Sequence, residues 1–174
     1  MPDTAPVSLA DLPALLQRFP SLQGLAPELR ARLARELHWL QAPRTRELFA
    51  AGERCLAFPL LLAGEVQVVR TTPDGHEIEL YRLRPGESCI VSTSCLLGEA
   101  LYPARAQALA EVVMAVMPQA LFDAVLAAHP PFRRYVFTLF AERLAQMMQR
   151  VEDVAFRSLT RRIAALLLEA GGNS

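Results

Sequence analysis

The stretch 61-LLAGEVQVVRTTPDGHEIELYRLRPGE-87 decides the fold class. Short runs of alternating apolar and polar residues lie on either side of Asp74-Gly75, a pair that supplies the positive φ of a hairpin turn. In the second run we expect Ile78 and Leu80 to face the core, because side chains alternate across a strand. The stretch therefore predicts two antiparallel strands joined by a tight turn.

Glycines recur every 11 or 12 residues around this hairpin, at Gly52, Gly64, Gly75, Gly86 and Gly98. Turn residues at such an interval, bounding short apolar segments, indicate an all-β roll or barrel. The later segment AQALAEVVMAVM is predicted to form one strand that closes the roll.

Helical patterns flank the predicted roll. They cover residues 11–19, where Asp11 is an expected N-cap, then 26–42, 119–129 and a long segment from 132 onward without glycine or proline. The first ten residues are predicted to form a flexible tail. The expected fold is α+β: an antiparallel, jelly-roll-like β-roll with short N-terminal helices and a long C-terminal helix.

The long helix carries an apolar seam with coiled-coil spacing. Its members are Val136, Phe140, Leu144, Met147, Val151 and Val154. Further apolar residues lie off this seam, so one face can cover the roll while the other meets a partner helix. We expect residues 130–156 to be a dimerisation helix and the chain to form a homodimer.

Composition excludes several other classes of protein. Eighteen basic and eighteen acidic residues cancel, which leaves no basic footprint for nucleic acid. Apolar residues make up 52% of the chain without a run of membrane-spanning length, so a globular domain without membrane contact is expected. The N-terminus lacks the features of an export signal. Three cysteines are too few for a disulfide scaffold, which favours a reducing, cytoplasmic location.

The order of these elements resembles the Crp/Fnr family of bacterial transcription regulators. The pieces that carry the resemblance are FPSLQGLAPELRARL before the roll, the stretch 61–87 in it, and YVFTLFAERLAQMMQRVEDVAFRSLTRRIAALLLEAG after it. The resemblance implies a cyclic-nucleotide-binding-type sensor domain over residues 11–129, the pairing helix, and a C-terminal helix-turn-helix domain on DNA. Residues 157–174 would be only the start of that domain, so DNA contact is expected only through a domain missing from this chain.

The binding cassette of the family departs from its pattern here. In nucleotide-binding members a Gly-Glu pair and a later arginine hold the ribose and the cyclic phosphate. Ile90 and Val91 stand at the expected Gly-Glu positions. A second Gly-Glu occurs at Gly98-Glu99, followed by Arg105 at a shorter spacing than the family pattern. A cyclic nucleotide is therefore a disfavoured effector, with Glu99 and Arg105 as its candidate contacts.

The segment SCIVSTSCLL replaces the usual cassette. The resemblance implies a short helix in this segment, and Ser92, Thr93 and Ser94 are expected to cap it. Three alternatives remain for Cys89 and Cys95: small buried apolar residues, a redox or persulfide switch that joins the two sulfurs, or a thiolate ligand of haem iron or another metal. Extended chain would hold the two cysteines roughly 20 Å apart, so a disulfide requires the chain to fold back.

Other chemistry has little support in the sequence. His76 is a candidate haem ligand in the third alternative only, and no cofactor or other metal site is expected. The region before Cys55 has no cysteine for an iron–sulfur cluster, and no His-x-His motif supports a cupin-like enzyme. We therefore expect no enzyme activity.

The function predicted from the sequence is effector sensing and dimerisation within a Crp/Fnr-like regulator. The expected signal is a redox, thiol or small-molecule effector that acts on residues 90–105 and repacks the seam. The alternatives are a cyclic-nucleotide or haem sensor of the same architecture, and a stand-alone dimerising module without DNA binding.

Overall fold

The structure is a computed structural model that describes residues 4–6 and 12–171. The chain divides into two compact units. The first, the roll unit, spans Met1–Val136, and the second, the helix unit, spans Phe137–Ser174. Each unit is described by itself.

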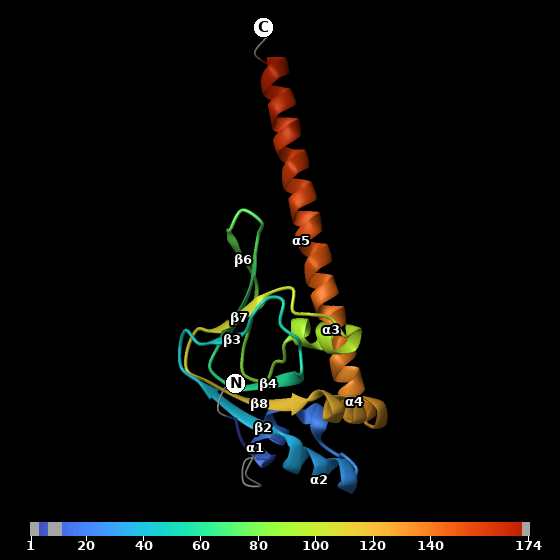
Figure 1. Cartoon of the computed structure of the whole chain (residues 1–174). Helices are drawn as coiled ribbons and strands as arrows, with labels where there is room; N and C mark the ends of the chain where they lie inside the picture. The colour runs from blue at the N-terminus through green and yellow to red at the C-terminus, as the bar shows by residue number, and fades with distance from the viewer. Residues whose placement is uncertain (1–3, 7–11, 172–174) are drawn as a thin grey trace. The chain divides into compact units, whose positions relative to one another are not determined.

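Two four-stranded antiparallel sheets form the roll (Figure 1). One sheet has the order β1-β2-β8-β4, with bounds Thr4–Pro6, His38–Ala42, Val112–Pro118 and Ala57–Ala63. The other has the order β3-β7-β5-β6, with bounds Glu47–Phe49, Arg105–Ala108, Val66–Thr71 and Glu77–Leu83. The predicted α+β fold with an antiparallel roll is confirmed.

Helices lie before, within and after the strands in the chain. They are α1 (Leu12–Arg18), η1 (Pro20–Leu22), α2 (Pro27–Glu36), α3 (Ile90–Gly98), α4 (Gln119–Ala128) and α5 (Pro130–Gly171). The α5 helix continues past residue 156, the expected end of the dimerisation helix. Its uninterrupted run of residues without proline or glycine explains this continuity, because nothing removes a backbone hydrogen bond.

The hairpin between β5 and β6 confirms the predicted turn. Gly75 has a φ of 84°, and the Thr72 carbonyl accepts hydrogen bonds from the Gly75 amide at 2.9 Å. The prediction that Ile78 faces the core is wrong, because its side chain is 53% exposed. A register shift between Val68 and Val69 alters the strand alternation, and the hairpin projects beyond the rest of the roll (Figure 1).

The helix predicted over residues 26–42 is shorter than expected. It ends at Glu36, Leu37 has an extended ψ of 143°, and residues 38–42 form strand β2 instead. His38 therefore lies in a strand, where it pairs with Val116 of β8. Pairing with β8 on one side and β1 on the other outweighs the helical pattern of the sequence.

Two further predictions about the strands require correction. The segment expected to form one closing strand forms β7 and β8, which belong to different sheets, with Leu109–Glu111 between them. Thr4–Pro6, inside the expected N-terminal tail, pairs with β2 as β1. Both differences depend on contacts between distant segments, which a local pattern does not contain.

An aromatic cluster holds the start of α5 inside the roll unit. Phe58 of β4, Phe122 of α4 and Phe132 of α5 are fully buried, with ring centroids 4.9–5.8 Å apart. Burial of such rings contributes roughly 1.5–3 kcal/mol each. The first turns of α5 are thus part of the roll core, and Val136 there is only 1% exposed.

Substitution of Gly64, which lies between β4 and β5, tests how closely the backbone packs at this point of the roll. Its φ is 86°, and an added Cβ would collide with the Glu111 carbonyl oxygen and lie 2.8 Å from Val112 Cγ1. Gly64→Ala is expected to lower the free energy of unfolding by about 2–3 kcal/mol, because the strain of alanine at a positive φ adds to the clash of its Cβ with Glu111 and Val112. Gly75→Ala is the matched control, since its φ is 84° but nothing lies within 4 Å, and about 1 kcal/mol is expected. Urea unfolding measures both, and equal losses would contradict the packing argument.

Candidate functional site

The first turn of α3 is the centre of the candidate site. The chain leaves β6 through a turn at Gly86 and enters α3, the short helix that the family resemblance implied. Ser88, just before the helix, is buried and its hydroxyl donates to the Pro59 carbonyl of β4. This contact fixes the start of α3 to the opposite sheet.

Cys89 caps α3, not the serines and threonine predicted for that role. Its Sγ accepts a hydrogen bond from the Ser92 amide at 3.4 Å, and its carbonyl accepts from the Thr93 amide at 2.9 Å. The Thr93 hydroxyl also donates to that carbonyl at 2.8 Å. Ser92 and Thr93 are buried inside the helix, and Ser94 is exposed. The prediction placed the helix start about three residues too late, because cysteine is not a usual N-cap residue.

Tyr81 supplies a second partner for the helix N-terminus. Its hydroxyl accepts a hydrogen bond from the Val91 amide at 3.1 Å and lies 3.2 Å from Cys89 Sγ. The first amides of a helix attract anions because they lack partners within the helix. Here the Val91 and Ser92 amides are already bound by side chains of the protein itself. Both amides at the start of α3 therefore have acceptors within the protein.

A second thiol and a second tyrosine extend this network. Cys55 Sγ donates to the Ser92 carbonyl at 3.5 Å, and the Ser92 hydroxyl lies 3.2 Å from Tyr102 Oη. The Tyr102 ring stacks on Phe49 with centroids 3.8 Å apart. Burial raises the pKa of Tyr102 far above its usual range, with the neighbouring Cys55 as a further cause. The hydroxyl therefore stays neutral. We call Cys55, Tyr81, Cys89, Ser92 and Tyr102 the thiol–tyrosine network.

The three cysteines are free and buried. Burial is the main cause that raises the pKa of both Cys55 and Cys95 above the ordinary value, so both are neutral thiols near pH 7. Cys95 Sγ donates to the Leu101 carbonyl at 3.4 Å. Six residues of α-helix separate Cys89 from Cys95, a rise of roughly 9 Å. That exceeds the span of a disulfide, so joining this pair would require α3 to unwind.

Glu99 and Arg105 are not brought together with the cysteines. Arg105 forms a bidentate ion pair with Glu77, at 2.6 and 2.8 Å. Its neighbours Ala106 and Ala108 belong to the core, so Arg105 lies on the opposite, outer face of β7. Glu99 is exposed at the end of α3, with a φ of 50°. Neither residue is positioned to hold a nucleotide inside the roll.

The histidines do not form a shared site. His76 is exposed at the tip of the β5–β6 hairpin, and His129 is buried between α4 and α5. Within the described part of the chain, no three His, Cys, Asp or Glu side chains gather where a metal ion could be held.

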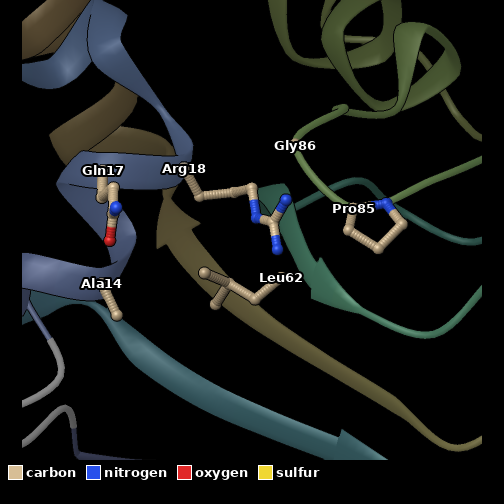
Figure 2. A pocket seen from close by; sticks show the side chains of 6 residues that line it. All are labelled: Ala14, Gln17, Arg18, Leu62, Pro85 and Gly86. Carbon is tan, nitrogen blue, oxygen red and sulfur yellow. The ribbon is translucent and has the colours of Figure 1, made fainter.

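An open depression lies beside the turn that leads into α3. Its volume is about 710 Å³, and it is lined by Ala14, Gln17, Arg18, Leu62, Pro85 and Gly86. Figure 2 shows the Arg18 side chain reaching from α1 toward Leu62 and Pro85. No predicted site residue lines it.

Val136, the first residue of the predicted dimer seam, does not share the exposure of the later seam residues. Val136 is buried in the roll unit, whereas Phe137 is 63% exposed. Phe137, Leu144 and Val151 recur every seven residues, and all three are exposed, as is Met147. Phe140 is half-buried, and the side chain of Val154 lies outside the described residues. The helix unit thus carries an apolar stripe with heptad spacing.

Comparison with known proteins identifies the family to which this fold belongs. Residues 40–129 match the family model for the cyclic nucleotide-binding domain. The chain belongs to this family. Its resemblance to Crp/Fnr regulators is confirmed by a CRP-like cAMP-activated global transcriptional regulator of Mycobacterium tuberculosis, 24% identical over 155 residues, which cover 89% of this chain and 68% of that relative.

Solved structures agree with this assignment. The catabolite activator protein of Thermus thermophilus is 26% identical, with a TM-score of 0.64 over 79% of this chain and 63% of that one. This chain therefore spans less than two thirds of that protein. A cAMP-binding acyltransferase from Mycobacterium smegmatis is 29% identical, with a TM-score of 0.65 over 79% of this chain and 42% of the other. The chain is therefore also similar to a protein that is named as an enzyme, an acyltransferase. No helix in the described ranges has both the length and the apolar character to cross a membrane.

Sequence reasoning missed Tyr81, Tyr102 and the role of Cys55. The expected alternation placed Leu80 inward, but the register shift in β5–β6 leaves both Leu80 and Tyr81 half-buried. Cys55 lies 34 residues before Cys89 in sequence, and no local pattern joins them. In the sequence, Tyr81 and Tyr102 lie within apolar segments, and no motif marks them as site residues.

The cap by Cys89 can be tested by substitution. Cys89→Ala is expected to lower the free energy of unfolding by about 1–2 kcal/mol, because the Ser92 amide loses its buried acceptor. Cys89→Ser keeps an oxygen acceptor at the N-cap and is expected to lose less than about 0.5 kcal/mol. Chemical unfolding of the reduced proteins measures the difference. Equal stability of the two variants would show that the thiol does not act as a cap.

Proposed function

We propose that this chain is the sensing and dimerisation part of a Crp/Fnr-like transcription regulator whose signal is not a cyclic nucleotide. The family match and the CRP-like relative support the regulator assignment. We further propose that it acts as a cytoplasmic homodimer and reaches DNA through a helix-turn-helix domain. The relatives include an acyltransferase, so a regulatory and not an enzymatic role is also part of the proposal.

One observation carries the choice of signal: the protein itself fills the anion site. Tyr81 and Cys89 bind the Val91 and Ser92 amides, which are the donors that a cyclic phosphate would need. Ile90 and Val91 offer no carboxylate for a ribose. Arg105 is engaged by Glu77 on the outer face.

A physical connection between α3 and α5 supports the sensing mechanism. The Ser88 hydroxyl donates to the Pro59 carbonyl, and Leu60 forms an isolated bridge with Ser88. Next to Pro59 in β4, Phe58 contacts Phe132 of α5 with centroids 5.6 Å apart. A change in the first turn of α3 would thus reach the base of α5 through β4. A signal acts this way if it favours one arrangement of the dimer by about 1–3 kcal/mol.

Calorimetric titration tests the nature of the signal. Reduced protein titrated with cyclic AMP or cyclic GMP is expected to give no saturable heat, because the helix amides are taken. A thermal melt of the same sample serves as the folding control. Stoichiometric binding that is lost in Arg105→Ala or Glu99→Gln would overturn the proposal and restore the nucleotide alternative.

Sedimentation of seam variants tests dimerisation. Leu144→Glu places a charge in the apolar stripe and is expected to weaken the dimer at least about tenfold, or 1.4 kcal/mol. Ala145→Glu adds the same charge one residue away, at an exposed position off the stripe, and is expected to leave the dimer intact. If both variants sediment like the unmodified protein, the stripe is not the dimer interface.

A further inference from the structure

We infer that Cys55 and Cys89 form a redox-active thiol pair that a hydroperoxide closes to a disulfide. The inference rests on the proposed function, in which α3 is the sensing element. It differs from the Cys89–Cys95 pair, one of the three alternatives left open by the sequence, in that it joins two distant segments of the chain.

Both thiols bind the same residue of α3. Cys89 Sγ accepts from the Ser92 amide at 3.4 Å, and Cys55 Sγ donates to the Ser92 carbonyl at 3.5 Å. The amide and the carbonyl of one helical residue point toward opposite ends of the helix and lie about 3.5 Å apart. These contacts therefore place the two sulfurs on either side of Ser92 and within roughly 10 Å, so one of them must move before a bond can form.

The chain around Cys55 can move without breaking regular structure. Cys55 lies between the isolated bridge at Arg54 and the start of β4 at Ala57. Cys89 is likewise the N-cap and not an interior residue of α3. Cys95, by contrast, is held in the body of α3, where its carbonyl accepts from the Ala100 amide at 3.0 Å. Side-chain rotation and a local shift can bring Cys55 to Cys89, whereas Cys95 can reach Cys89 only if the helix unwinds.

The chemistry uses one hydroperoxide per pair. The Cys89 thiolate attacks the outer peroxide oxygen, the O–O bond breaks, and a sulfenic acid forms while an alcohol or water leaves. The Ser92 amide and the Tyr81 hydroxyl are placed to hydrogen-bond the charged sulfur. The Cys55 thiol then loses its proton and attacks the sulfenic sulfur, which expels water and forms the S–S bond. Two thiols are oxidised and one hydroperoxide is reduced.

Disulfide formation would alter the same hydrogen bonds that define the start of α3. Cys55 would no longer donate to the Ser92 carbonyl, and Cys89 would turn away from the Ser92 amide. The first turn of α3 would lose its cap. This loss gives the oxidation a structural consequence at the proposed sensing element.

Peptide mapping of the native chain tests the pair. The folded, reduced protein is treated with a small molar excess of hydrogen peroxide, blocked with iodoacetamide in denaturant and cut with trypsin. Cleavage after Arg54 and Arg70 releases Cys55 in residues 55–70, whereas Cys89 and Cys95 share residues 83–105, because the Arg84-Pro85 bond resists trypsin. We expect the two peptides to be joined, with Cys95 alkylated.

Variants assign the sulfurs. Cys55→Ala and Cys89→Ser, which keeps an N-cap oxygen, are expected to abolish the joined peptide, and Cys95→Ser is expected to retain it. A bond inside residues 83–105, a bond between Cys55 and Cys95, or no disulfide at all would overturn the inference. The nucleotide titration uses reduced protein, so failure of the thiol pair with nucleotide still unbound would leave the proposed function standing.

Discussion

The buried N-terminus of α3 imposes the constraint on which the candidate site depends. A helix start inside a protein exposes amides that must find acceptors, and leaving one unpaired costs about 1–3 kcal/mol. The family resemblance implies that a ligand phosphate would accept hydrogen bonds from these amides in nucleotide-binding members. In this chain the Cys89 sulfur and the Tyr81 hydroxyl accept them instead. Both amides at this position are therefore bound by side chains of the protein itself.

The two residues predicted to contact a nucleotide lie outside the interior of the roll. Arg105 forms its ion pair with Glu77 on the outer face of the sheet, and Glu99 lies exposed beyond the end of α3. The space near α3 is filled by Tyr102, which stacks on Phe49. The interior beside α3 therefore holds thiols and hydroxyls, including Cys55, Cys89 and Tyr102.

The aromatic contacts at the base of α5 attach the start of the long helix to the roll core. Phe132 belongs to α5 but is buried against Phe58 and Phe122, so the start of the long helix is part of the roll core. Beyond Val136 the helix unit presents exposed apolar side chains at heptad spacing. One continuous helix thus has a first turn that packs in the core and a later stripe of exposed apolar side chains.

The sequence by itself determined the fold class, the β5–β6 hairpin and the long helix. Each follows from local information: Gly75 at a positive φ, short apolar runs, and a segment without helix breakers. It also showed that Ile90 and Val91 replace the Gly-Glu pair. Only the tertiary structure decided that residues 38–42 form a strand and that Arg105 faces outward. It also decided that Cys55 and Cys89 both bind the backbone of Ser92. Those features depend on strand register and on contacts between residues far apart in the chain, which local periodicity does not encode.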